Sequence, residues 1–153
     1  MSLEKAKQYL KNYGLENEIL EFSVSSATVA EAAKAINGKE EEIAKTLSFV
    51  LNDKPILIVA SGDSKIDNSK YKAEFHTKAK MIPFDDVEPL IGHAVGGVCP
   101  FGVNDDVTIY LDISLKKLAY LYPACGSSNS AIKLTVEQLE KITNFEKWID
   151  VCK

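Results

Sequence analysis

Two apolar runs joined by a short polar turn constrain the fold of this chain most strongly. Thr46 to Leu51 and Ile56 to Ala60 are rich in aliphatic residues, and the segment between them reads Asn52-Asp53-Lys54-Pro55. Turn-forming residues between two strand-like runs predict a β-hairpin. Because both runs are apolar along most of their length, we expect both strands to be buried.

Single helices and further short strands surround this hairpin in the sequence. Helical patterns cover Leu3 to Tyr13, Thr28 to Asn37, Glu40 to Glu42, Asn68 to Phe75, Phe84 to Ile91 (begun by Asp85) and Thr135 to Asn144. Strand patterns cover Ile19 to Val24, Gly97-Val98, Thr108 to Asp112, Tyr120 to Ala124, Ala131 to Leu134 and Trp148 to Val151. Since no repeat or linker interrupts residues 1–153, we predict one α+β domain, a mixed and mostly antiparallel β-sheet surrounded by short helices.

The basic residues narrow the possible functions. All 18 of them are lysine, and the formal net charge is −4. A chain without arginine has no bidentate guanidinium clamp, and an acidic chain is unsuited to coating long nucleic acids through many phosphate contacts. One locally basic segment remains, which carries Lys65, Lys70, Lys72, Lys78 and Lys80. It is either a small nucleic-acid contact or a solvated helix face.

The cysteines and the apolar runs indicate the compartment. Cys99, Cys125 and Cys152 are odd in number and far apart, which argues against a disulfide framework. With only two histidines at unsuitable spacing, we also expect no metal site and no cofactor. No run approaches the roughly 18 apolar residues of a membrane span, and Leu3 to Tyr13 lacks the apolar core of a signal peptide. We therefore expect a cytoplasmic protein with reduced thiols and no membrane partner.

A glycine-rich loop is the first candidate for a binding site. The sequence Gly96-Gly97-Val98-Cys99-Pro100-Phe101-Gly102 pairs two residues that lack a Cβ with a proline that stiffens the loop. Such a loop brings peptide N–H groups close to a ligand and suits a carbonyl or carboxyl group. A plain turn between strands has the same composition, so the loop alone does not decide.

Two further side chains carry possible chemistry. Lys45 lies between apolar neighbours at the start of the first strand of the hairpin, where a lysine either serves a ligand or extends its ammonium to water. Cys99 is a possible nucleophile with His93 as its base, but nothing in the sequence orients His93. We interpret Cys99 as a small apolar loop residue instead.

Six short motifs, in this order and spacing, resemble the YbaK/EbsC family, which is related to the editing insertion domain of bacterial prolyl-tRNA synthetases. The resemblance runs from about Thr28 to the C-terminus. It rests on Thr28-Val29-x-Glu31-Ala32-Ala33, Ile43-x-Lys45-Thr46-Leu47, Gly62-Asp63-x-x-Ile66-Asp67, Val95-Gly96-Gly97-Val98-x-Pro100-Phe101-Gly102, Tyr110-Leu111-Asp112-x-Ser114-Leu115 and Ala124-x-Gly126. The chain departs from the family at Cys99, where serine is more usual, and at Ala124-Cys125-Gly126, which is one residue longer than the usual Ala-Gly.

The resemblance implies a stand-alone trans-editing hydrolase that cleaves the ester between a mischarged amino acid, alanine or cysteine, and the terminal adenosine of proline tRNA. A water molecule, or a group of the substrate itself, would attack the ester. By resemblance the catalytic residues are Lys45, Gly96, Gly97 and Pro100. The substrate-binding residues would be Thr46, Val98, Cys99, Phe101, Gly126, Ser127 and Ser128, and the acceptor end of the tRNA would meet Lys65 and Lys70. Prolyl-tRNA synthetase is a possible partner.

Two other classes of function remain open at this point. A module that binds aminoacyl-tRNA or a synthetase without turnover would keep the same motifs. A cysteine-dependent hydrolase or redox enzyme would require a Cys99 thiol whose pKa lies below its usual range.

Overall fold

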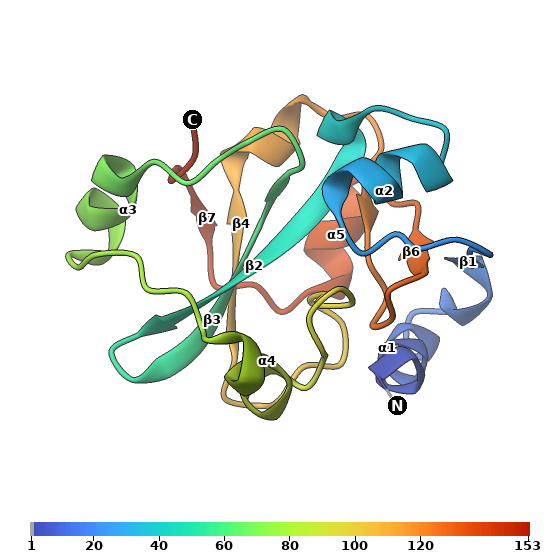
Figure 1. The fold of residues 1–153 in the computed structure, drawn as a ribbon, viewed down its shortest axis with the longest axis horizontal. Helices are drawn as coiled ribbons and strands as arrows, with labels where there is room; N and C mark the ends of the chain where they lie inside the picture. The colour runs from blue at the N-terminus through green and yellow to red at the C-terminus, as the bar shows by residue number, and fades with distance from the viewer. Residues whose placement is uncertain (1) are drawn as a thin grey trace.

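The predicted hairpin lies at the centre of the structure, a computed structural model that describes residues 2–153 (Figure 1). Its strands are β2 (Ile43–Leu51) and β3 (Lys54–Ser61), paired antiparallel. The turn is only two residues long, because Asn52 and Asp53 both adopt positive φ (52° and 67°), the geometry of tight hairpins. Pro55, expected in the turn, belongs to β3. There it faces Val50 in a pair that exchanges no hydrogen bonds, so its missing N–H costs nothing.

A mixed five-stranded sheet is built outward from this hairpin, in the order β5-β2-β3-β4-β7. The added strands are β4 (Thr108–Asp112), β5 (Tyr122–Pro123) and β7 (Trp148–Ile149), and each of them pairs in parallel. A second, antiparallel sheet joins β1 (Ile19–Glu21) to β6 (Ser130–Ile132). The α+β fold with mixed sheets is therefore confirmed. The longest pairing is antiparallel, whereas the other three pairings of the larger sheet are parallel.

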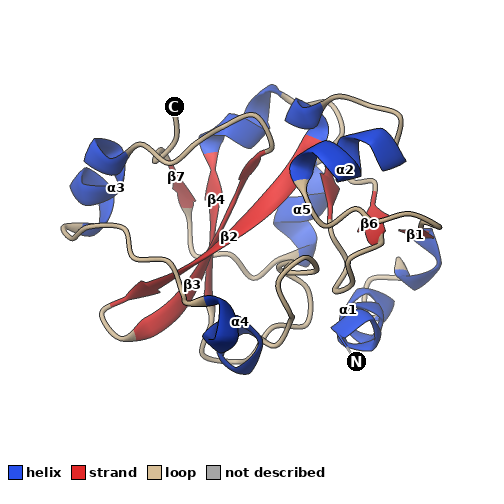
Figure 2. Cartoon of the chain, viewed as in Figure 1, coloured by secondary structure: helices blue, strands red, loops and turns tan. Residues whose placement is uncertain are grey.

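In residues 2–153, five α-helices and three 3-10 turns surround the sheets, as the cartoon in Figure 2 shows by colour. The helices are α1 (Ser2–Lys11), α2 (Val29–Ala35), α3 (Asn68–Phe75), α4 (Phe84–Ile91) and α5 (Val136–Ile142), and the 3-10 turns are η1 (Glu16–Glu18), η2 (Glu40–Glu42) and η3 (Ile113–Lys117). Thr28 with Glu31, and Thr135 with Gln138, form the capping boxes that begin α2 and α5. Pro83, not Asp85, precedes α4. Within residues 2–153, no helix has the length and apolarity needed to cross a membrane.

Alternation along the central strands divides the core between the two faces of the larger sheet. Leu57 and Val59 of β3 pack with residues of α1, α4 and α5, whereas Ile56 and Ile58 pack with the aromatic side chains around α3. Figure 2 accordingly shows α3 to the left of the strands and α1 and α5 to their right. Burying one such aliphatic side chain stabilises the fold by roughly 1.5–3 kcal/mol, so both faces hold the hairpin in place.

Several predicted strands differ from the structure. β7 ends at Ile149, two residues earlier than predicted, and β6 covers Ser130–Ile132 where Ala131 to Leu134 was expected. Gly97-Val98 is not a strand, because Gly96 has a φ of 96° and the N–H of Gly97 closes a turn onto the carbonyl oxygen of Ala94 at 3.0 Å. The strand predicted for Tyr120 to Ala124 is reduced to β5, which contains a proline and therefore has one donor fewer. β1 ends at Glu21, three residues earlier than predicted.

Candidate functional site

An apolar cavity of about 500 Å³ lies along β2, between the start of α2, the start of α4 and the glycine-rich loop. This volume is typical of sites that bind small molecules. Its walls are formed by Ser26 to Val29, Ala32, Ile43 to Ser48, Met81, Ile82, Phe84, Val87, Val95, Gly96, Val98, Tyr122, Ala124, Ser130 and Ala131. The cavity therefore combines strand, helix and loop segments that are far apart in the sequence.

Lys45 provides the cationic group of the cavity. Its ammonium donates hydrogen bonds to the backbone carbonyl oxygen of Ser64 and, at 3.5 Å, to that of Gly62. None of the ion pairs among residues 2–153 involves Lys45. Burial lowers the pKa of Lys45 below its usual range, and the positive charge of Lys65 adds to this shift, while Asp63 opposes it. A desolvated ammonium without a carboxylate partner is suited to a polar or anionic group of a ligand.

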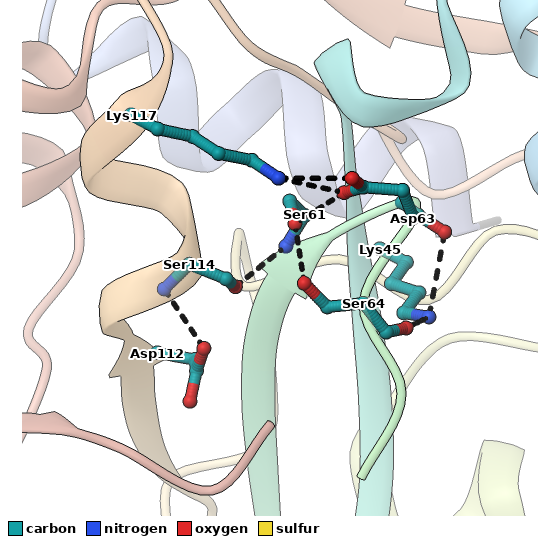
Figure 3. A network of polar contacts seen from close by, with 8 residues as sticks. Lys45, Ser61, Asp63, Ser64, Asp112, Ser114 and Lys117 are labelled. Atoms are coloured by element: carbon teal, nitrogen blue, oxygen red, sulfur yellow. Dashed lines mark hydrogen bonds and ion pairs between the residues drawn. The ribbon is translucent and has the colours of Figure 1, made fainter. Parts of the chain in front are cut away.

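The carbonyl groups that hold Lys45 belong to a loop with its own polar network, shown in Figure 3. The hydroxyl of Ser61 donates to the Asp63 carboxylate at 2.7 Å and lies 2.6 Å from the hydroxyl of Ser64. Lys117 pairs with Asp63 at 2.9 Å, and this contact lowers the pKa of the Asp63 carboxyl group. The network fixes the loop against η3, and thereby fixes the acceptors of the Lys45 ammonium.

Thr46 follows Lys45 in the cavity wall, as the resemblance implies. Its hydroxyl oxygen is buried and has no hydrogen-bond partner among the described residues. Buried polar atoms normally find a partner. The free hydroxyl of Thr46 is therefore a candidate ligand contact.

The glycine-rich loop reaches the cavity through Val95, Gly96 and Val98. Gly97 does not line it. Its N–H is used in the turn with Ala94, and a Cβ at Gly97 would lie 2.5 Å from the carbonyl carbon of Gly126 and 2.6 Å from the nitrogen of Ser127. Gly97 thus permits two loops to approach closely. Its N–H is already bonded to Ala94, so of the two glycines expected to donate to a ligand, only Gly96 lines the cavity.

The second half of the loop turns away from the cavity. Cys99, Pro100 and Phe101 are buried and do not belong to its wall. Cys99 and Phe101 therefore do not line this cavity, and their assignment to substrate binding stays a prediction. Both side chains point into the apolar core, where their burial stabilises the loop.

Cys99 and His93 do not form a nucleophile and base. Both side chains are 0% exposed. His93 Nε2 lies 2.6 Å from the carbonyl oxygen of Phe101, so this nitrogen carries the proton, and the Cys99 sulfur lies 3.5 Å from it. Burial raises the pKa of the Cys99 thiol to about 12, which leaves it protonated at neutral pH. No orienting partner for His93 was visible in the sequence, but the carbonyl oxygen of Phe101 is one in the structure.

The turn at Gly126 to Ser128 supports the cavity from outside. Gly126, Ser127 and Ser128 are absent from its wall. The Ser127 hydroxyl donates to that of Ser130 at 2.7 Å, and the carbonyl oxygen of Ser128 accepts from the N–H of Ser26 at 2.7 Å. Ser26 and Ser130 line the cavity themselves. Sequence reasoning missed both, although Ser26 stands just before the Thr28 cap.

The two lysines assigned to tRNA have different surroundings. Lys70 pairs with Asp150 at 3.1 Å and donates to the carbonyl oxygen of Cys152 at 2.9 Å, so it holds the C-terminal segment. Lys65 is exposed and exchanges two backbone hydrogen bonds with Lys153, at 3.2 and 2.8 Å. Of these two lysines, only Lys65 is outside the ion pairs found among residues 2–153. Its positive charge is also close enough to Lys45 to affect the pKa of Lys45.

The rim of the cavity is apolar and exposed. Phe84 is 74% exposed, Met81 60% and Val95 48%, and all three contribute to the cavity wall. Across residues 2–153, no group of three His, Cys, Asp or Glu side chains could hold a metal ion. The site as a whole is an apolar pocket with one cation and a few hydroxyl and peptide groups.

Comparisons with known proteins show the family to which the chain belongs. The family model of the aminoacyl-tRNA editing domain matches residues 24–142, which include the whole cavity wall. YwhH of Bacillus subtilis (strain 168), an uncharacterized protein, is 47% identical over 100% of this chain and 98% of its own length. EbsC of Enterococcus faecalis, provisionally named a Cys-tRNA(Pro)/Cys-tRNA(Cys) deacylase, is 29% identical over 79% of this chain and 73% of its own.

Structural similarity extends over nearly the whole chain. A crystal structure described provisionally as a trans-editing enzyme for prolyl tRNA synthetase superposes with a TM-score of 0.88 at 26% identity, covering 99% of this chain and 97% of that one. A segment of the proline--tRNA ligase of Lactiplantibacillus plantarum is also similar, at 23% identity over 81% of this chain and 22% of the ligase. The family match spans the cavity and the relatives share the complete fold, so this chain belongs to the aminoacyl-tRNA editing domain family.

Proposed function

We propose that this chain is a stand-alone hydrolase that removes a mischarged amino acid from tRNA. The observation that carries the proposal is the desolvated, carboxylate-free ammonium of Lys45 in the wall of an apolar cavity sized for a small ligand. A synthetase pocket separates amino acids that differ by a methylene by only about 1–3 kcal/mol, so a second hydrolytic site is needed for small amino acids. The apolar walls suit such a side chain.

Alanine and cysteine attached to proline tRNA are the substrates that we propose. The name of EbsC supports cysteine, and the size and apolar character of the cavity suit either side chain. The exposed rim at Phe84 and Met81 is suited to the terminal adenosine, because aromatic side chains stack on bases. Lys65 is suited to a backbone phosphate of the acceptor end, whereas Lys70 is engaged with Asp150.

The reaction needs no protein nucleophile, because an aminoacyl ester is already activated. In the proposed step a water molecule, or a group of the substrate, adds to the ester carbonyl carbon, and the bond to the ribose oxygen breaks. When water attacks, its proton passes to that oxygen, and the products are the free amino acid and the uncharged tRNA. Lys45 orients the ribose end or polarises the ester, and peptide N–H groups at Gly96 stabilise the developing negative charge. Pro100 stiffens the loop that carries Gly96.

A module that binds aminoacyl-tRNA or prolyl-tRNA synthetase without turnover is the alternative. A panel of tRNAs charged with alanine, cysteine or proline distinguishes the two, because only an enzyme in catalytic amounts releases many equivalents of amino acid. We expect multiple turnovers on Ala- or Cys-tRNA(Pro) and little release from Pro-tRNA(Pro). Binding without release would favour the module, and neither binding nor release would exclude both.

A further inference from the structure

The open edge of β2 presents unused peptide groups to the cavity. In a hairpin with a two-residue turn, the flanking residues Leu51 and Lys54 exchange hydrogen bonds. Along each strand the residues then alternate. One turns its N–H and C=O away from the partner strand, and the next one bonds to that strand. On β2 these outward residues are Val50, Ser48, Thr46 and Ala44. Two observed bonds agree: the N–H of Val50 donates to Lys80 at 2.8 Å, and the carbonyl of Ser48 accepts from Ile82 at 3.2 Å.

The gap in this edge is centred on Thr46. At one end β5 pairs with Ile43 and Ala44, and at the other the segment at Met81 bridges to Phe49. Thr46 is the outward-facing residue between these two pairings. The register of β5 on β2 ends at Ala44, and among residues 2–153 no backbone hydrogen bond outside the strand pairings involves the N–H or C=O of Thr46. Thr46 lines the cavity, and its buried hydroxyl is also without a partner.

Unpaired buried backbone groups are rare in folded proteins. Here a donor, an acceptor and a hydroxyl of the same residue are unpaired at the same wall of a cavity. An α-aminoacyl group has the N–Cα–C=O connectivity of one strand residue. It can therefore exchange with Thr46 the two hydrogen bonds of a single antiparallel pair: its ammonium donates to the Thr46 carbonyl oxygen, and its acyl oxygen accepts from the Thr46 N–H.

We propose that the backbone of Thr46 binds the α-ammonium and the acyl carbonyl group of the substrate, as a one-residue extension of the sheet. The proposal rests on the proposed function and names the groups of the substrate that the cavity recognises. Because Ala44 pairs with β5 and the carbonyl oxygen of Ser48 accepts from Ile82 on the same edge, the slot accepts one amino acid and excludes an acylated amino group or a peptide. Recognition through the backbone leaves the side chain of the amino acid to the apolar walls.

Substrates altered at the α-amino group test the proposal on the unmodified protein. Alanyl-, lactyl- and N-acetylalanyl-tRNA share the acyl carbonyl and the methyl group. We expect lactyl-tRNA, which lacks the charged donor, to lose about tenfold or more in kcat/KM, and N-acetylalanyl-tRNA to lose about a hundredfold or more, since hydrogen bonds to charged groups are among the stronger ones. Equal rates on all three would overturn the slot but leave the deacylase intact. No release from alanyl- or cysteinyl-tRNA would refute the proposed function itself.

Hydrogen exchange reports on the slot without turnover. The probe is 3′-alanylamino-3′-deoxyadenosine, an amide that resists hydrolysis. We expect it to slow exchange at the Thr46 amide, whereas the amide of Leu47, which faces β3, serves as the internal control. Unchanged exchange at Thr46 with the probe bound elsewhere in the cavity would contradict the proposal.

Two substitutions separate the backbone from the hydroxyl. Thr46→Pro deletes the outward N–H on an open edge, where proline is tolerated, and Thr46→Val removes the hydroxyl alone. We expect Thr46→Pro to lose at least tenfold more kcat/KM than Thr46→Val. Equal losses would assign the contact to the side chain. If Thr46→Pro does not fold, the altered substrates and the exchange measurement still decide.

Discussion

The ammonium of Lys45 donates a hydrogen bond to the backbone carbonyl oxygen of Ser64. Ser64 belongs to the loop that the Asp63–Lys117 ion pair ties to η3, so a surface contact sets the position of the ammonium of a residue in the cavity wall. Because the acceptors are uncharged carbonyl groups, they do not neutralise the positive charge of the Lys45 ammonium. Lys45 can therefore hold a substrate oxygen, which a lysine paired with a carboxylate would do less well.

The first prediction concerns Lys45→Met, which keeps the apolar stem and removes the charge. We expect single-turnover deacylation of Ala- or Cys-tRNA(Pro) to fall by roughly 10²–10³, as for the loss of one charge-stabilising donor. The melting temperature should change little, because removing a partly buried charge also removes the cost of its desolvation. Lys141→Met, on the exposed side of α5, is the matched control. Full activity of Lys45→Met would remove Lys45 from the mechanism.

The second prediction concerns Gly97→Ala. The new methyl group would lie 2.5–2.7 Å from backbone atoms of Gly126 and Ser127, which cannot move like a flexible side chain. We expect a loss of stability of roughly 1–3 kcal/mol or more, as for overpacking elsewhere. Gly14→Ala is the control, because Gly14 has a φ of 71° but open space around the added Cβ. If denaturant titration shows equal losses, close packing of the two loops is not what requires glycine at 97.

Local signals in the sequence predicted much of the fold correctly. The hairpin and the caps at Thr28 and Thr135 depend on residues within a few positions of one another, so their physics is visible in a short stretch of chain. The strand predicted at Gly97-Val98 failed because the left-handed conformation of Gly96 breaks an extended backbone.

The site was harder to predict than the fold, because its walls depend on long-range pairing. Ser130 reaches the cavity through the pairing of β6 with β1, and the free edge at Thr46 exists because β5 is only two residues long. Glycine content suggested a binding loop, but the sequence could not show that Gly97 faces another loop while Gly96 faces the cavity. The composition of a loop is local information, whereas its direction is not.

The third prediction separates Lys65 from Lys70. Lys65→Gln should raise the KM for charged tRNA and lower the salt dependence of binding by about one phosphate contact, with kcat nearly unchanged. Lys70→Gln should instead lower the melting temperature slightly, because Lys70 holds Asp150 and Cys152 of the C-terminal segment. Binding measured over a series of salt concentrations compares the two variants. If both variants lower the salt dependence of tRNA binding equally, Lys70 also contacts the tRNA.

The fourth prediction concerns Phe84 at the rim of the cavity. If the terminal adenine stacks on this exposed ring, Phe84→Ala should raise KM about tenfold, consistent with the roughly 1–3 kcal/mol of one base–aromatic stack. Phe84→Trp should restore binding. Tyr120 is a second exposed aromatic residue that lies outside the cavity wall, so Tyr120→Ala is the control. A KM that is the same for Phe84→Ala and Tyr120→Ala would place the adenine elsewhere.

The last prediction concerns the loss of stability in acid that the buried His93 causes. Burial lowers the pKa of His93 below its usual 6.5, because a charged ring would lose its hydration in the core, and the hydrogen bond from Nε2–H to the carbonyl oxygen of Phe101 opposes this shift only in part. Above pH 6.5 the ring is neutral in both the folded and the unfolded chain. As the pH falls below 6.5, the unfolded chain binds a proton that the folded chain excludes, so the free energy of unfolding decreases toward the lower pKa of the folded state.

Denaturant titrations between pH 7 and pH 5 test this dependence. His93→Gln retains a donor for the Phe101 carbonyl oxygen but cannot titrate, so its free energy of unfolding should fall less steeply with acid than that of the unmodified protein. The difference in slope should approach, and not exceed, one proton. His76→Gln, on the exposed turn after α3, is the control. Parallel slopes for His93→Gln and the unmodified protein would mean that the folded chain accommodates a charged ring at this position, and burial would then not lower the pKa of His93.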